Sequence, residues 1–237
     1  ISNDPSECEL YVVEGDSAGG CFSGDTEVTL ADGRKLSFIK LITEQKEGKQ
    51  NYCYTIGKDN RIEISRIENV RKTKSNASVI EVILDDKESI ICTPDHKFML
   101  RDGSYKEAKD LDTEDSLMPL YKKLSKKNKR ITIEGYEMVL NPSTSRWIFT
   151  HILADKYNLE NNTYSEKSGT HRHHVDFNKL NNNPDNIMRL NKDKHLKIHR
   201  EHANKTLHNE KVYEKLRKLR KTDEFRKKMR KRMHKPE

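Results

Sequence analysis

Short runs rich in β-branched side chains alternate with two-residue turn signals between residues 21 and 120. The runs cover residues 27–30, 78–84 and 89–92. The turn signals are Asp32-Gly33, Asp59-Asn60, Asp85-Asp86 and Asp102-Gly103. Runs this short suit strands better than helices, and β-branched side chains favour the pleated backbone. The pattern therefore predicts an all-β module rather than a parallel sheet with connecting helices.

The chain as a whole offers little apolar material for large cores. Of its 237 residues, 32% are hydrophobic and 35% are charged, so we expect small domains with solvated extensions. No window approaches the ~18 consecutive apolar residues of a membrane span. The first residues also show no basic-then-apolar signal. These features predict a soluble, intracellular chain with no membrane partner.

The positive charge lies at one end of the chain. Residues 205–237 hold fourteen Lys and Arg against five Asp and Glu, which is +9, so the preceding 204 residues carry 8 − 9 = −1. Apolar residues recur among these charges in a broadly helical rhythm. Such a run can be a solvated face, but it can also bind the DNA backbone with salt-dependent, largely non-specific affinity. We expect a basic, helical DNA-binding tail over residues 206–237.

The four cysteines, Cys8, Cys21, Cys53 and Cys92, form no Cys-x-x-Cys pair. Neither a disulfide framework nor a cysteine zinc site is therefore indicated. Cys21 directly follows Gly20, and a thiol in that position can attack the preceding carbonyl and convert the amide into a thioester. Glycine imposes the smallest steric cost on such a strained bond. The alternative is a buried structural cysteine at the start of a strand.

The residues on either side of this bond resemble two different families. Residues 9–20, with Glu14-Gly-Asp-Ser-Ala-Gly-Gly20, resemble the acidic metal-binding loop of the gyrase B proteins, which belong to the type II DNA topoisomerases. Residues 21–28 resemble the start of an intein. In the topoisomerases the residue matching Glu14 takes part in DNA cleavage with two further aspartates, and we assign Glu14 no activity here. The resemblance implies a host fragment over residues 1–20.

The segment Cys92-Thr-Pro-Asp-His96 resembles the second intein motif, Thr-x-x-His. The family implies that His96 protonates the scissile amide and that Thr93 helps to hold it. A histidine is suited to donating a proton near neutral pH, although a solvated histidine in a surface turn is the alternative. The intein resemblance covers residues 21–120 and implies the N-terminal part of a Hint-type splicing domain.

An intein closes with an apolar strand, His-Asn and a downstream Ser, Thr or Cys, and residues 233–237 do not match that ending. We therefore expect a C-terminal intein fragment to act in trans, or the sequence to be truncated. Residues 121–135 are rich in lysine and predict a basic linker. Residues 145–157 predict an amphipathic helix with Trp147 as its anchor. On its apolar side we expect His151 to be a satisfied core histidine.

Histidines cluster in the next segment. His195 and His199 are four residues apart, so on a helix both imidazoles can reach one ion. His173 and His174 are neighbours on an extended segment and should point to opposite sides, one toward a metal and one toward a substrate phosphate. The alternatives are a structural zinc site or merely polar histidines.

Residues 136–205 resemble the HNH nucleases, with His174, Asn186 and His195 as landmarks. The family implies metal ligands at His173, His195 and His199. It also implies a general base at His174, held by Asn186, which bonds across the loop. The divalent ion is Mg²⁺, Mn²⁺, Zn²⁺ or Ni²⁺. For His171 two roles stay open, a phosphate contact or no role, and we interpret His202 and His208 as surface residues.

Together these features predict a mainly β splicing domain (Hint-type), a small α+β (ββα-metal, HNH) nuclease domain and a basic helical tail. The resemblance implies a genetic element within gyrase B, of bacterial or phage origin and cytoplasmic. It would splice its host protein and cut double-stranded DNA at the gyrase B gene insertion site. Two alternatives stay open: a degenerate splicing remnant that acts only as a DNA-binding or nuclease module, and an autocleaving Hint domain.

Overall fold

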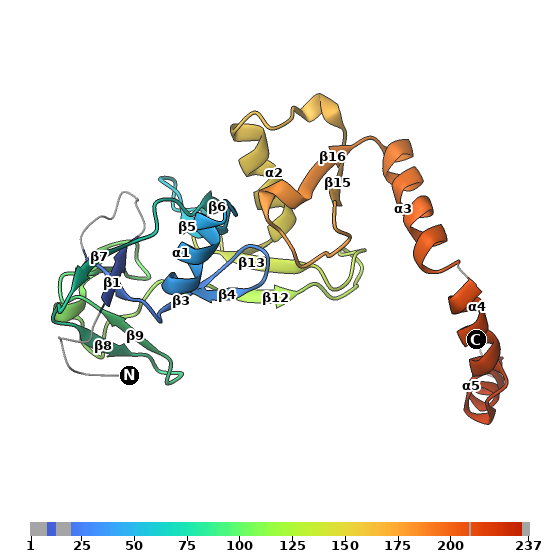
Figure 1. Ribbon diagram of the computed structural model, residues 1–237, viewed down its shortest axis with the longest axis horizontal. Coiled ribbons are helices and arrows are strands. Elements are labelled where there is room, and N and C mark those ends of the chain that lie inside the picture. The colour runs from blue at the N-terminus through green and yellow to red at the C-terminus, as the bar shows by residue number, and fades with distance from the viewer. Residues whose placement is uncertain (1–8, 13–19, 209, 234–237) are drawn as a thin grey trace. The chain divides into compact units, whose positions relative to one another are not determined.

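The computed structural model describes residues 9–12, 20–208 and 210–233 (Figure 1). Its contacts divide the chain into two compact units. The first comprises the described residues up to 166 together with 172–189, and the second comprises 167–171 and the described residues from 190 onward. No helix among the described residues is long and apolar enough to cross a membrane.

A five-stranded antiparallel sheet lies in the first unit, in the order β7-β1-β2-β9-β8. Its strands are β1 (Glu9–Val12), β2 (Phe22–Ser23), β7 (Arg71–Ser75), β8 (Ile80–Ile83) and β9 (Ser89–Cys92). The runs predicted at 78–84 and 89–92 are thus confirmed as strands. The sheet also contains β1, which comes from the stretch that we interpreted as host sequence.

Hairpins form at the predicted turn signals. β3 (Glu27–Thr29) pairs with β4 (Lys35–Ser37), β5 (Tyr52–Ile56) with β6 (Ile62–Arg66), and β10 (Lys97–Met99) with β11 (Tyr105–Glu107). Gly33 at φ +88° and Asn60 at φ +57° adopt the left-handed backbone that such turns need. The predicted β-rich character of residues 21–120 is confirmed.

One helix packs onto this β-rich region. Ser37 caps α1 (Phe38–Lys46) by accepting a hydrogen bond from the Lys40 N–H. The helix buries Phe38 and Leu41 against Leu30, with Ile67 and Val70 completing the cluster. A short 3-10 helix, η2 (Ala108–Asp110), follows β11.

The predicted linker and the predicted helix both contain strands. β12 (Lys122–Leu124), within the basic linker segment, pairs with β13 (Glu137–Asn141), which also pairs with β14 (Arg146–Phe149). The helix expected from residue 145 is therefore wrong in its first part, because α2 spans Thr150–Glu160. Trp147 lies on β14 opposite Leu140, where cross-strand pairing outweighs helical periodicity.

One of the two hydrophobic clusters joins segments on both sides of the linker. Ala31, Tyr52, Ile62 and Ile64 come from the predicted splicing region, and Val139, Leu153, Ala154 and Ile187 come from the predicted nuclease region. Within the first unit, the region preceding the linker and the region following it are therefore stabilised by the same packed residues.

The remaining elements carry most of the histidines. β15 (His171–His174) pairs with β16 (Ile187–Leu190), and the short helices η3 (Glu166–Ser168) and η4 (Pro184–Asn186) precede β15 and β16 respectively. Asn191 caps α3 (Lys192–Thr206) by accepting from the Lys194 N–H at 2.9 Å. α4 (Glu210–Arg220) and α5 (Asp223–Met233) are the last two helices of the described residues. The helical character predicted for the basic tail is confirmed.

Candidate functional site

Cys21 is held against Thr93 by two reciprocal hydrogen bonds. The Cys21 N–H donates to Thr93 Oγ1 at 2.9 Å, and the Thr93 N–H donates to the Cys21 carbonyl at 2.9 Å. Pairing of Phe22 with Cys92 in the sheet sets this register. Both residues are buried, with 9% of Cys21 and 5% of Thr93 exposed. The nitrogen of the Gly20–Cys21 bond is thus fixed by a side chain 72 residues away.

His96 lies against Gly20 on the other side of the same bond. Burial lowers the pKa of His96, and the neighbouring Gly20 backbone, which raises it, only partly offsets that effect. The ring packs between Phe22, at 4.1 Å, and Phe98, at 5.0 Å between centroids, and its Nδ1 is buried without a hydrogen-bond partner. The structure therefore brings the predicted Cys21, Thr93 and His96 together around one amide.

Only glycine fits at position 20. Its φ of +113° lies in the left-handed region, and a Cβ there would stand 2.4 Å from the His96 Cα. A side chain would push the loop of His96 away from the Gly20–Cys21 bond. Glu14 lies outside the described residues.

A further contact at this bond was not predicted from the sequence. Cys21 Sγ lies 3.3 Å from Thr73 Oγ1, on β7. A hydrogen bond with Thr93 lowers the pKa of Asp95, between Thr93 and His96 in sequence. Burial raises the pKa of Cys53 and of Cys92 to about 11, which keeps those two thiols protonated and unreactive.

A second cluster surrounds His174 on β15. Its Nε2 lies 3.1 Å from Oδ1 of Asn182, a side chain that is 1% exposed. The Asn182 amide group donates to the Leu180 carbonyl at 3.2 Å, so its oxygen faces His174. This network places the imidazole proton on Nε2 and leaves Nδ1 as the basic nitrogen. Burial also lowers the pKa of His174.

Asn186 braces the loop, while Asn182 makes the bond to His174. Asn186 Oδ1 accepts from the Asp176 N–H at 3.0 Å, and its amide donates to Asp176 Oδ1 and to the Asn181 carbonyl, both at 2.8 Å. The cross-loop bonding expected of Asn186 is present. The direct hold on His174 instead belongs to Asn182, because the turn of residues 176–182 brings Asn182 nearer to the ring.

His151, at the start of α2, is a core histidine, but it is not a satisfied one. It is 9% exposed, and its Nδ1 is buried without a hydrogen-bond partner. Its ring packs against Tyr136, Phe149 and His174, at 5.4 to 5.8 Å between centroids. Burial lowers the pKa of His151 to about 4, so it lies neutral beside His174.

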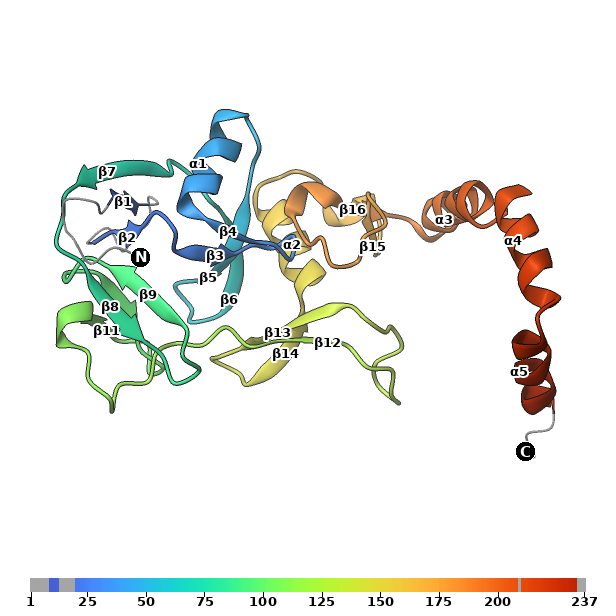
Figure 2. The same ribbon diagram turned by 60° about the horizontal axis from the view of Figure 1, so that its bottom comes forward.

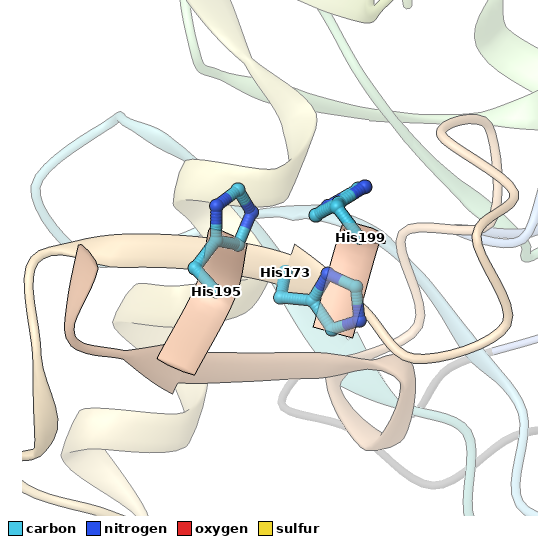
Figure 3. A group of neighbouring side chains, drawn as sticks. All are labelled: His173, His195 and His199. Carbon is cyan, nitrogen blue, oxygen red and sulfur yellow. The ribbon is translucent and has the colours of Figure 1, made fainter. Parts of the chain in front are cut away.

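The three predicted metal ligands are neighbours (Figure 3). One ring nitrogen from each of His173, His195 and His199 lies within 4.8 Å of the others. His195 and His199 lie one turn apart on α3, with their ring centroids 4.5 Å apart. Three neutral imidazoles fit a transition metal such as Zn²⁺ or Ni²⁺. His171 packs its ring 5.1 Å from His195, and His208 is exposed beside Tyr213.

Comparison with known families identifies the class of protein to which the chain belongs. The model of the family "Intein splicing domain" matches residues 28–229. Because this match covers most of the chain, the chain belongs to that family, whose members carry out protein splicing.

One relative places the chain more narrowly. The DNA gyrase B protein of Synechocystis sp. (strain ATCC 27184 / PCC 6803 / Kazusa) is 59% identical over 237 residues. The match includes all of this chain and 22% of the gyrase sequence, so the chain spans about a fifth of that relative's length. The two matches together agree with an intein within a gyrase B sequence.

Proposed function

We propose that this chain forms a thioester at Gly20–Cys21 as the first step of protein splicing. The observation that carries the proposal is the convergence of Thr93 and His96 on the two sides of that amide. Sγ of Cys21 attacks the Gly20 carbonyl carbon, a C–S bond forms and the C–N bond breaks. The thiol loses its proton to solvent, and the departing Cys21 nitrogen gains one from His96, which takes a replacement proton from solvent.

Later splicing steps need groups that we do not assign to residues of this sequence. We propose that a C-terminal intein segment supplies the asparagine that cyclises, with the host residue that follows it as the acceptor. A gyrase B polypeptide is the proposed host, since the related gyrase B matches along the whole chain.

Hydroxylamine tests the thioester, because at neutral pH it cleaves thioesters far faster than amides. The chain should lose residues 1–20 on treatment, while His96→Ala should lose them at least about tenfold more slowly. His202→Ala, which changes a histidine outside the Cys21 site, is the matched control and should behave like the parent. Equal release from parent and His96→Ala would contradict the assigned role of His96.

We propose DNA cleavage by the His174 cluster as a second function. Asn182 supports this proposal, because it holds His174 as the Nε2–H tautomer and leaves Nδ1 to take a proton from water. The loop that supplies Asn182 is braced by Asn186. The proposed reaction is hydrolysis of a DNA phosphodiester, with His174 as the general base.

The donor set of His173, His195 and His199 fits a divalent ion, which would stabilise charge on the phosphate and on the leaving oxygen when bound. Mg²⁺, Mn²⁺, Zn²⁺ and Ni²⁺ are the candidate ions. The basic helices α4 and α5 would bind the backbone of double-stranded DNA, and affinity should therefore fall steeply with salt. The proposed target is an uninterrupted gyrase B gene, at the insertion site.

The nuclease is tested with a plasmid that carries the uninterrupted gyrase site, incubated with Mg²⁺ or Mn²⁺ at low salt. The parent should nick or cut it, and His174→Ala should reduce the rate by at least about a hundredfold with DNA binding unchanged. Asn182→Ala should also slow cleavage without weakening binding. An intact plasmid with every ion would contradict the nuclease proposal and would favour a splicing element alone.

A further inference from the structure

The strand β1 lies between two strands of the splicing region. It pairs with β2, with Leu10 opposite Ser23 and Tyr11 opposite Phe22. On its other side it pairs with β7, from Glu9 opposite Ser75 to Val12 opposite Arg71, and the register shifts between Leu10 and Tyr11. Figure 2 shows β1 between β7 and β2. The segment upstream of Cys21 is thus bound through its backbone on both edges.

The charges of the two partners are complementary. Residues 1–20 contain five Asp and Glu and no Lys or Arg, a formal charge of −5. Facing β1, β7 contributes Arg71, Lys72 and Lys74, and every residue of β7 is exposed. In this register Glu9 lies opposite Ser75, and the three basic residues lie opposite Leu10, Tyr11 and Val12. The attraction is therefore between the overall charges of the two segments, so it is modest and is weakened by salt.

The position of β1 is also linked to the reactive cysteine. β7 supplies Thr73, whose Oγ1 lies 3.3 Å from Cys21 Sγ. On the other edge β2 begins at Phe22, directly after Cys21. Both strands that hold β1 therefore contact or adjoin the nucleophile, so binding of the upstream strand and alignment of the Gly20–Cys21 bond depend on the same two elements.

We propose that β2 and β7 form a docking site for an extended, acidic segment of the host polypeptide. Backbone pairing holds the segment with little dependence on its side chains, and the basic side chains of β7 favour acidic sequences. Its effect on processing rests on the proposed thioester step at Cys21. Strand docking itself is a separate property that can be measured without any reaction.

Amide hydrogen exchange of the full chain tests the docking. Cys21→Ala keeps the Gly20–Cys21 bond intact, and in this background the amides of residues 10–12 should be protected. Adding Lys72→Glu and Lys74→Glu should speed their exchange by roughly threefold to tenfold at low salt, and less at high salt. Further addition of Glu7→Lys and Glu9→Lys should restore protection.

The matched control reverses two exposed lysines away from the sheet, Lys126→Glu and Lys127→Glu, with the same change in net charge. It should leave the exchange of residues 10–12 unchanged. Unprotected amides at residues 10–12 in the Cys21→Ala background, or equal acceleration by both charge reversals, would overturn the proposal.

The same charge variants with Cys21 restored separate docking from chemistry. Slower hydroxylamine release of residues 1–20 from Lys72→Glu/Lys74→Glu supports docking as part of the thioester step. Faster exchange with unchanged release would overturn that link while supporting the docking site. Faster exchange with no release from any variant, the parent included, would contradict the thioester proposal and still support docking.

Discussion

Thr93 holds the amide nitrogen of Cys21 through a single oxygen. Thr93→Val keeps the shape of the side chain and removes that acceptor, which leaves the buried Cys21 N–H without its partner. We predict that thiol-induced release of residues 1–20 slows about tenfold in Thr93→Val. Thr93→Ser, which keeps the hydroxyl, should retain most of the parent rate. Kinetics followed by mass spectrometry check the pair, and equal rates for Val and Ser would contradict this role.

His151 makes the fold sensitive to acid. Its pKa in the folded state is about 4, below the value of about 6.5 that an unfolded chain gives. The unfolded chain therefore binds a proton at His151 more tightly than the folded chain does. The contribution of neutral His151 to the stability of the fold is fully present above pH ~6.5 and is lost as the pH falls toward 4. The loss amounts to about 3 kcal/mol.

His151→Phe should remove most of this pH dependence, since a ring of similar size fills the site and the unpartnered Nδ1 disappears. Urea unfolding at pH 7.5 and pH 4.5 measures the difference. The parent should lose more stability than His151→Phe between the two values. An equal loss in both would mean that His151 is protonated, or solvated, in the folded chain.

Sequence reasoning predicted residues that the structure brings together at each candidate site, but it missed several side chains that contact them. Cys21, Thr93 and His96 could be predicted because their spacing follows a known motif. Thr73 and Asn182 could not, since a strand and a turn brought them to Cys21 and His174. Nothing in the residues around either position distinguishes it from an ordinary Thr in a strand or Asn in a turn.

Asp155 ties α2 to the hairpin of β15 and β16. The carboxylate is 2% exposed and accepts from Arg189 at 2.6 and 2.7 Å, from Arg172 at 2.9 Å and from Tyr164 at 2.9 Å. Burial alone would raise the pKa of Asp155, but these donors outweigh it and the pKa is lowered. The ion pairs therefore hold a histidine-bearing strand and a core helix together.

We predict that Asp155→Ala destabilises the fold by about 3 to 5 kcal/mol, because it leaves the buried guanidinium of Arg189 without its carboxylate. Glu210→Ala breaks an exposed pair with Arg217 and should cost less than about 1 kcal/mol. Denaturant unfolding of both variants at pH 7 checks the contrast. A loss of less than about 1 kcal/mol in the free energy of unfolding of both variants would mean that the Asp155 ion pairs do not stabilise the fold.

Turns, strands and helices were predicted best where a few neighbouring residues determine the backbone conformation. The turns at Gly33 and Asn60 follow from single residues with defined backbone preferences. The helix expected from residue 145 was wrong up to Phe149, because Trp147 and Ile148 satisfy a helical period as well as a strand period. Pairing with β13, which a local pattern does not contain, decided between the two.

At the scale of the whole molecule, the regions before and after residues 121–135 share one hydrophobic core, which the composition did not indicate. A lysine-rich stretch predicted a boundary at residues 121–135, yet Leu153 and Val139 pack with Tyr52 and Ile64 from the other side of it. Charged segments on a surface and true linkers have the same composition. Only the packing distinguishes them.

Leu153→Ala should destabilise both regions at once, by about 2 to 5 kcal/mol. Fluorescence of Trp147, the only tryptophan, reports on the β13–β14 region, and hydrogen exchange of β5 and β6 reports on the region before the linker. Both should shift to the same lower denaturant midpoint. Separate transitions, with β5 and β6 unaffected, would mean that the two regions unfold independently.

The central claim is that Cys21 attacks the Gly20 carbonyl, and intact mass after incubation with a strong thiol tests it most directly. The parent should lose residues 1–20 with time and leave a fragment that begins at Cys21, while Cys21→Ala should keep its full mass. Release of the same fragment from Cys21→Ala, or no release from either chain, would contradict the claim.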